Sequence, residues 1–101
     1  MTAAKRTQVR IVNPMGLHAR PAGRFVAVAA DFDAHIRVAC RGEEVDGGSI
    51  LSLLMLEAMR GMELRITATG PQAEQALAAL GELVAGGFEE PESVDGRGAR
   101  G

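Results

Sequence analysis

The sequence has 101 residues, of which 47% are hydrophobic and 24% are charged, with a formal net charge of −2 at pH 7. This length predicts one domain with room for a single site. The mixed charges and the scarcity of aromatic residues (three Phe, no Trp and no Tyr) argue against a nucleic-acid-binding surface. Without a long apolar run or an apolar segment in residues 1–6, we expect a cytoplasmic protein with no signal peptide and no membrane insertion.

The single cysteine, Cys40, cannot form an internal disulfide. The two histidines, His18 and His35, and the one cysteine are scattered without the spacing of zinc ligands, which argues against a zinc site. We therefore expect no metal and no cofactor.

The first elements are a strand, a turn and a helix. Residues 7–12 alternate between apolar and polar side chains, which predicts a half-buried strand. Residues 13–16 read NPMG, a composition typical of turns. From Ala19 to Ala30 the apolar residues recur with a helical period, and Pro21 fits in the first turn because its missing N–H would have no partner there.

Alternation returns over residues 34–40 and predicts a second strand, with His35 facing outward and Cys40 facing inward. His35 is expected to be a solvated surface residue and Cys40 a small buried hydrophobe. A short turn then leads to a brief return strand at residues 43–45.

Ser49 is a suitable N-cap for a helix predicted over residues 50–59, and Gly61 follows at the expected stop. Residues 62–69 alternate again and predict the last strand, with Leu64, Ile66 and Ala68 facing inward. The final helix follows and presents a long apolar stripe, made of Ala73, Ala76, Leu77, Leu80, Leu83 and Val84.

The order strand–helix–strand–strand–helix–strand–helix, with its alternating strands, predicts an antiparallel sheet with helices on one face. The polar residues at the end of the sequence predict a disordered tail. We place one domain at residues 1–89 and this tail at residues 90–101.

His18 lies at the junction between the turn and the first helix. The free backbone amides of a helix N-terminus, here those of Ala19 and Arg20, favour an anion such as phosphate, and the Arg20 guanidinium offers further donors. A nucleophile beside such donors suits reversible phosphoryl capture. On these residues alone, however, a capping or surface role for His18 and a merely solvated Arg20 are the simpler interpretations.

Three segments change that balance. The run NPMGLHARPA resembles the phosphorylation-site signature of HPr, the phosphocarrier of the bacterial phosphoenolpyruvate-dependent phosphotransferase system. The run DGGSIL at residues 46–51 resembles the regulatory-serine segment of that family, and GGF at residues 86–88 matches the end of such chains. The resemblance extends from Lys5 to Glu89.

The resemblance implies an α+β, open-faced, two-layer sandwich, with a four-stranded antiparallel sheet in the order 1-4-2-3 and three helices on one side. It implies that His18 accepts phosphate on Nδ1 from enzyme I and passes it to an enzyme IIA-type or regulatory acceptor, while Arg20 helps to hold the phosphate. It also implies a monomeric carrier that does not act as an independent catalyst.

Ser49 has two interpretations, a plain helix N-cap and a regulatory phosphorylation site served by a serine kinase/phosphorylase, as in many Gram-positive relatives. The lysine that usually precedes this serine in the family is Gly48 here, which removes a positive charge beside the hydroxyl. The two interpretations stay open.

The helix after Ser49 has apolar side chains in more directions than one core face needs. Three of them correspond to the family's partner-docking patch: Ile50, Leu51 and Leu54. Leu53 and Leu56 are expected in the core. Met55 and Met59 fit either the core or the docking patch, and the core is the favoured place for them. The run LLML is closer to the nitrogen-related branch of the phosphotransferase system than to the sugar branch.

Two other functions are compatible with parts of this pattern. One is an HPr-like regulatory domain that binds partners through Ser49 and the apolar patch without relaying phosphate. The other is an unrelated sandwich that senses a small ligand. The presence of both His18 and Arg20 favours the carrier over either alternative.

Overall fold

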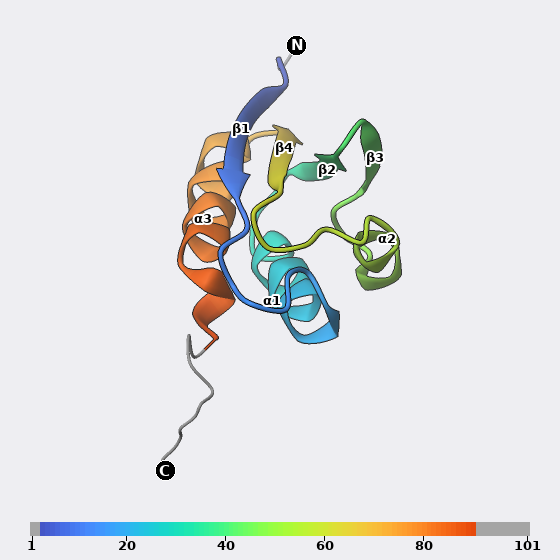
Figure 1. Cartoon of the computed structure of the whole chain (residues 1–101). Helices are drawn as coiled ribbons and strands as arrows, with labels where there is room; N and C mark the ends of the chain where they lie inside the picture. The colour runs from blue at the N-terminus through green and yellow to red at the C-terminus, as the bar shows by residue number, and fades with distance from the viewer. Residues whose placement is uncertain (1–2, 91–101) are drawn as a thin grey trace.

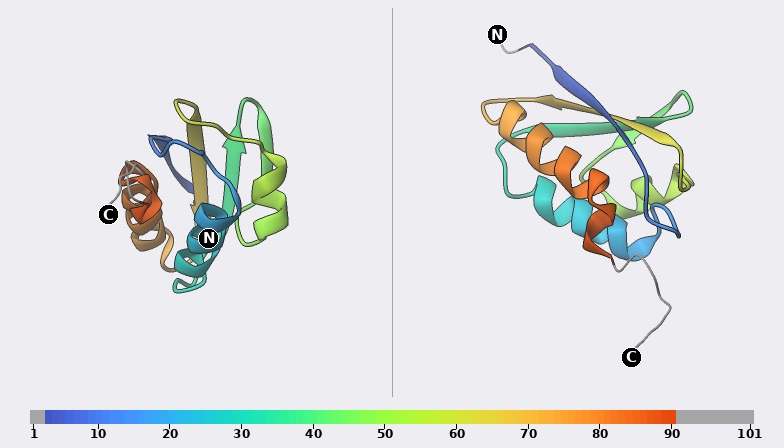
Figure 2. Two further views of the ribbon diagram at one scale, coloured as in Figure 1. Left: turned by 60° about the horizontal axis from the view of Figure 1, so that its bottom comes forward. Right: turned by 60° about the vertical axis from the view of Figure 1, so that its left-hand side comes forward.

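The computed structural model describes residues 3–90, which form one sheet layer and one layer of helices (Figures 1 and 2). The elements are, in chain order, β1 (Lys5–Arg10), α1 (Ala19–Ala29), β2 (His35–Cys40), β3 (Glu43–Asp46), α2 (Ile50–Met55), β4 (Glu63–Thr69), α3 (Ala73–Ala85) and the 3₁₀ helix η1 (Gly87–Glu89). The helices lie on one face of the sheet, as the right-hand view of Figure 2 shows. The predicted α+β open-faced sandwich is confirmed.

The sheet is antiparallel throughout and has the order β1-β4-β2-β3. Strand β4 is central, because Ile66 pairs with Thr7 of β1 on one side and with Val38 of β2 on the other. This arrangement confirms the order that the family resemblance implies.

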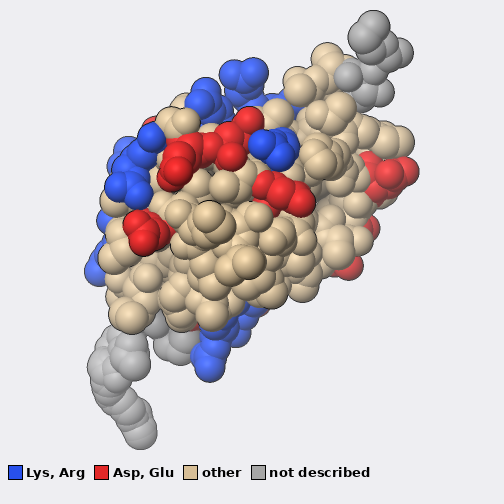
Figure 3. All heavy atoms as spheres, turned by 90° about the vertical axis from the view of Figure 1, so that its right-hand side faces the viewer, with Lys and Arg blue, Asp and Glu red and all other residues tan. Residues whose placement is uncertain are grey.

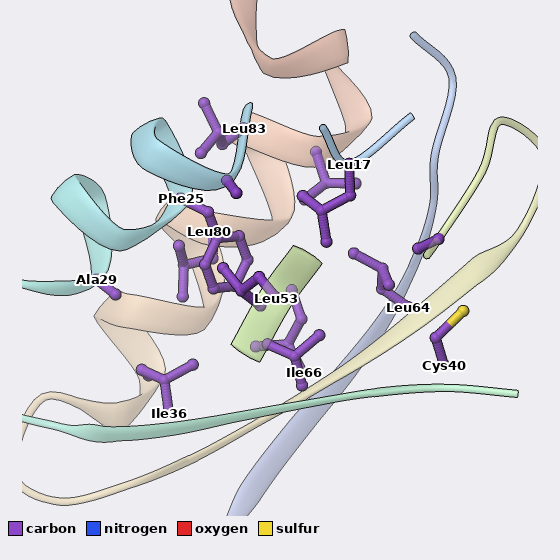
Figure 4. Packing of buried hydrophobic residues seen from close by; sticks show 14 of the residues in the cluster. Leu17, Phe25, Ala29, Ile36, Cys40, Leu53, Leu64, Ile66, Leu80 and Leu83 are labelled. Atoms are coloured by element: carbon purple, nitrogen blue, oxygen red, sulfur yellow. The ribbon is translucent and has the colours of Figure 1, made fainter. Parts of the chain in front are cut away.

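The core lies between the sheet and the helices. Every second residue of β4 faces the helices, and the side chains of Leu64, Ile66 and Ala68 are fully buried. Figure 4 shows Phe25 of α1 and Leu80 of α3 pointing into the same interior. The predicted apolar stripe of α3 is buried along its whole length. Burial of each Leu- or Phe-sized side chain contributes about 1.5–3 kcal/mol to stability.

Helix α2 ends at Met55, four residues before the predicted end. The amide of Glu57 donates to the carbonyl oxygen of Leu54 at 3.1 Å, and Glu57 itself has φ = 51°, in the left-handed region that stops a helix. The chain then turns inward and buries Ala58, which is 2% exposed.

This early end corrects the expectation for two methionines. Met55 is 67% exposed and Met59 51% exposed, so the prediction that both lie in the core was wrong. The core side of α2 is occupied by Leu53, and Met55, two residues on, points to the opposite side of the helix. Met59 lies beyond the helix and is not on its face at all.

Cys40 is buried and His35 is exposed, as predicted. Within residues 3–90, no helix is long and apolar enough to cross a membrane. That same part of the chain contains no group of three or more His, Cys, Asp or Glu side chains arranged to share a metal ion. Of the predicted tail, residues 91–101 lie outside the described residues.

Candidate functional site

His18 is the N-cap residue of α1. Its backbone is extended (φ = −86°, ψ = −169°), and its carbonyl oxygen accepts the first helical hydrogen bond from the amide of Ala22 at 2.9 Å. Its side chain does not cap the helix and is 36% exposed. The imidazole therefore stands at the start of α1 and is reachable from outside.

A tight turn holds His18 in this place. Gly16 has φ = 69°, and its amide donates to the carbonyl oxygen of Asn13 at 3.1 Å. A Cβ at position 16 would lie 2.6 Å from the carbonyl oxygen of Ala58, so no larger residue fits without a shift of the backbone. Leu17 is buried, and its amide donates to that same oxygen at 2.9 Å. The turn is thus anchored immediately before His18.

The first turn of α1 leaves two backbone donors beside the imidazole. Pro21 has no N–H, and no side chain caps the helix, so the amides of Ala19 and Arg20 have no intrahelical partner. Arg20 is exposed, and within the described part of the chain its guanidinium forms no hydrogen bond or ion pair. The structure therefore brings together at one helix end His18 and the two backbone amides predicted for the site.

A carboxylate that the sequence did not predict lies against His18. The Oε2 atom of Glu90 is 3.1 Å from the Nε2 atom of His18, and Oε1 of the same carboxylate is 3.4 Å from it. The Glu90 side chain is only 12% exposed, and the Nδ2 group of Asn13 donates to its Oε1 at 3.1 Å. Glu90 was predicted to belong to the tail, because no local sequence pattern marks it. The one feature of the sequence that could have indicated an ordered Glu90 is its position two residues after Phe88, which is buried and anchors the end of the domain.

The predicted docking residues form an exposed apolar surface on α2. Ile50 is 42% exposed and Leu51 70% exposed, while Leu54 is half-buried. Figure 3, which views the molecule from the side of α2, shows a broad area without Lys, Arg, Asp or Glu, bordered by charged residues. Such an area on a small domain is typical of an interaction site.

A shallow hollow connects His18 with the end of α2. Its lining residues are Met15, Leu17, His18, Arg41, Leu54, Glu57, Ala58, Met59 and Met62. Of the predicted docking residues, only Leu54 shares this hollow with His18. Arg41, which the sequence analysis did not single out, brings a guanidinium into the hollow and donates from Nη2 to the carbonyl oxygen of Leu56 at 3.1 Å.

Ser49 is the N-cap of α2, and its Oγ atom accepts a hydrogen bond from the amide of Ser52 at 3.2 Å. The residue before it, Gly48, donates from its amide to Oδ1 of Asp46 at 2.9 Å. The plain structural interpretation of Ser49 is thus confirmed, while its regulatory phosphorylation stays a prediction.

A family model for the "PTS HPr component phosphorylation site" matches residues 5–86. The chain belongs to the HPr family. The phosphocarrier protein NPr of Escherichia coli K12 is 41% identical over 81% of this chain and 92% of its own length. The phosphocarrier protein HPr of Pseudomonas aeruginosa is 42% identical over 84% of this chain and 96% of its own. Among solved structures, HPr from Thermoanaerobacter tengcongensis has a TM-score of 0.82 at 34% identity and covers 86% of this chain and 98% of its own.

Membership of the HPr family gives the chain a general role as a phosphoryl carrier of the phosphotransferase system, not as an independent catalyst. The similarity to NPr and the similarity to HPr are almost equal. These two relatives therefore do not assign the chain to the nitrogen-related branch or to the sugar branch.

Proposed function

We propose that His18 receives the phosphoryl group from phospho-enzyme I and passes it to an enzyme IIA-type or regulatory acceptor in the cytoplasm. The observation that carries this proposal is the position of His18 at the open N-terminus of α1, beside the free amides of Ala19 and Arg20. A transferred phosphoryl group needs mainly positioning and charge stabilisation, which amide donors, a helix N-terminus and a guanidinium supply.

The two ring nitrogens of His18 have different surroundings, and we propose that Nδ1 is the acceptor. Nε2 faces the carboxylate of Glu90, which would repel an incoming phosphoryl group. Nδ1 is bonded directly to Cγ and lies nearer the main chain, so a phosphoryl group on it would be closer to the amides of Ala19 and Arg20. The Arg20 guanidinium would bind its outer oxygens.

A carrier must dock in turn on a donor and an acceptor that both reach the same histidine. We propose that both partners bind the α2 surface of Ile50, Leu51 and Leu54, because it is exposed and adjoins the hollow that contains His18. Docking there would bury apolar side chains and bring the partner's reactive atom to the start of α1. The carrier acts as a monomer in this scheme.

We also propose that a phosphate on Ser49 would act on docking and not on the chemistry of His18. Ser49 directly precedes Ile50 and Leu51, so a dianionic group there would oppose burial of the docking surface. The side chain of Asp46 already places a negative charge beside this segment, and Gly48 supplies no cation to offset it. Recognition by a serine kinase is therefore expected to be weaker than with the usual lysine.

Incubation with enzyme I and labelled phosphoenolpyruvate tests the acceptor. The expected result is an acid-labile, base-stable label that is absent from His18→Ala. The variant should retain the wild-type circular dichroism spectrum, since His18 lies at a helix end outside the core. A His18→Ala variant that still takes up label contradicts the assignment. If the wild-type chain takes up no label from an active enzyme I, the binding-domain alternative, which uses the same α2 surface, is favoured.

A further inference from the structure

We propose that Glu90 is a positioning residue for phosphoryl transfer, acting through the Nε2 atom of His18. Its carboxylate holds a proton on Nε2, leaves the lone pair of Nδ1 free and balances the positive charge that the ring acquires when Nδ1 bonds to phosphorus. This inference rests on the proposed role of His18 as the acceptor.

The Glu90 carboxylate lies within hydrogen-bonding and ion-pairing distance of the His18 ring, with Oε1 at 3.4 Å from Nε2 in a hydrogen bond. The Nε2–Oε2 distance is 3.1 Å, and the Glu90 side chain is only 12% exposed, so water screens the pair less than it screens a surface ion pair. A carboxylate only accepts hydrogen bonds, so this contact requires the proton of the neutral ring to be on Nε2. Within residues 3–90, no other carboxylate lies within 4 Å of a ring nitrogen of His18.

Asn13 orients the carboxylate. Its Nδ2 group donates both to Oε1 of Glu90 at 3.1 Å and to the carbonyl oxygen of Gly16 at 2.8 Å. Asn13 is 3% exposed, and its Oδ1 atom has no hydrogen-bond partner among the described residues. The amide thus serves as a donor that links Glu90 to the turn before His18.

The end of the domain is folded so that Glu90 reaches the imidazole. Phe88 is fully buried although its φ of 59° is unusual for a residue with a side chain, and Glu89 follows with φ = 63°. Arg24 of α1 donates from Nη1 to the carbonyl oxygen of Phe88. The amide of Glu90 then donates to the carbonyl oxygen of Gly87 at 3.1 Å. These contacts fix the segment beside α1 and direct the Glu90 side chain toward His18.

The chemistry gives this contact a role in both directions of transfer. The Nδ1 lone pair forms the bond to phosphorus while the bond from phosphorus to the donor breaks, and that electron pair stays on the donor. The proton on Nε2 remains, so the ring becomes positively charged beside the Glu90 carboxylate. When the group moves on to the acceptor, the N–P bond breaks and its electron pair returns to Nδ1. A fixed carboxylate stabilises the positive ring at each step, as the aspartate does for histidine in serine hydrolases.

The test compares Glu90→Gln and Glu90→Ala with the wild-type full chain, and uses Glu89→Gln as the matched control because Glu89 is exposed. We expect kcat for transfer from phospho-enzyme I to fall about tenfold in both Glu90 variants, the size of a hydrogen bond to a charged group. KM should be unchanged because the α2 surface is intact. Glu89→Gln should behave as the wild type.

Nitrogen-15 NMR of the His18 ring tests the position of the ring proton separately from the rate of transfer. Near neutrality the unprotonated ring of the wild type should carry its proton on Nε2, and Glu90→Ala should increase the share of the Nδ1–H tautomer. Glu90→Gln should also increase that share, because Asn13 favours the amide oxygen at the Oε1 position and so places the amide NH2 donor at the Oε2 position, 3.1 Å from Nε2. It should transfer slowly as well, because the negative charge is gone.

Wild-type kcat in both Glu90 variants, or an unchanged tautomer in Glu90→Ala, would overturn the role of Glu90. A wild-type label found on Nε2 would also overturn it while leaving His18 as the acceptor. A label that persists in His18→Ala would instead refute the acceptor itself. The NMR comparison in the unphosphorylated protein tests the Glu90 contact independently of that result.

Discussion

The amide of Leu17 and the carbonyl oxygen of Ala58 are joined by a hydrogen bond of 2.9 Å. This bond links the residue before His18 to the segment that follows α2. The candidate phosphoryl acceptor and the proposed docking surface are therefore held in a fixed relation by the backbone, and a partner that binds α2 meets His18 at a defined position.

Gly16→Ala should disrupt this link. The added Cβ would lie 2.6 Å from the carbonyl oxygen of Ala58, and the φ of 69° is also unfavourable for alanine. We expect a loss of about 2–4 kcal/mol in the free energy of unfolding, the strain at positive φ plus the clash. Urea denaturation measures it. The control is Gly42→Ala, which has φ = 85° but no atom within 4 Å of the added Cβ, and should lose only the strain. Equal losses in the two variants would show that position 16 is not crowded.

Ser49→Ala should lower the free energy of unfolding by about 1 kcal/mol, because the amide of Ser52 loses its capping partner. Ser49→Asp should keep the cap and the stability, but should raise KM for phospho-enzyme I, because it places a negative charge beside Ile50 and Leu51. Denaturation and transfer kinetics on the two variants distinguish the capping role from the effect of charge. Transfer by Ser49→Asp at wild-type KM would argue against regulation of docking through this residue.

Leu51→Glu should leave the free energy of unfolding within about 0.5 kcal/mol of the wild type, since this side chain is 70% exposed. It should raise KM for phospho-enzyme I by about tenfold or more, because docking would otherwise bury the leucine. Ala78→Glu places the same charge on an exposed position of α3 and is expected to transfer normally. An equal increase in KM in both variants would show that net charge, and not the α2 surface, determines how the carrier binds phospho-enzyme I.

Arg20→Ala should reduce kcat for phosphoryl transfer by about tenfold without a loss of stability, because its guanidinium makes no hydrogen bond or ion pair with any described residue. Arg20→Lys should be intermediate, since an ammonium group cannot offer the planar pair of donors. Arg65→Ala, on the exposed face of β4, is the control. An active Arg20→Ala would leave the backbone amides as the sole phosphate donors at the site.

The parts of the structure that were predicted correctly from the sequence are those determined by residues close together in the chain. Alternation in β4 identified Leu64, Ile66 and Ala68 as core residues, and the helical period identified the buried stripe of α3. The strand order depends on pairing between strands that are far apart in the sequence, and only the resemblance to a family predicted it.

The errors and omissions arise where distant contacts decide the outcome. Met59 was placed in a helix predicted over residues 50–59, with the core as its favoured side, but the left-handed Glu57 ends the helix first. Glu90 was missed because its partner His18 is 72 residues away in the sequence. Neither the reversal of the chain at Phe88 nor the position of Asn13 is encoded in a motif that spacing alone reveals.

The central position of β4 also sets the timing of folding during synthesis. Strand β1 pairs only with β4, in a register that joins Lys5 to Ala68 and Arg10 to Glu63. A nascent chain therefore holds β1 without a neighbour until more than half of the polypeptide has left the ribosome. Such long-range pairing delays closure of the sheet, because β2 and β3 can pair as neighbours in sequence whereas β1 must wait for β4.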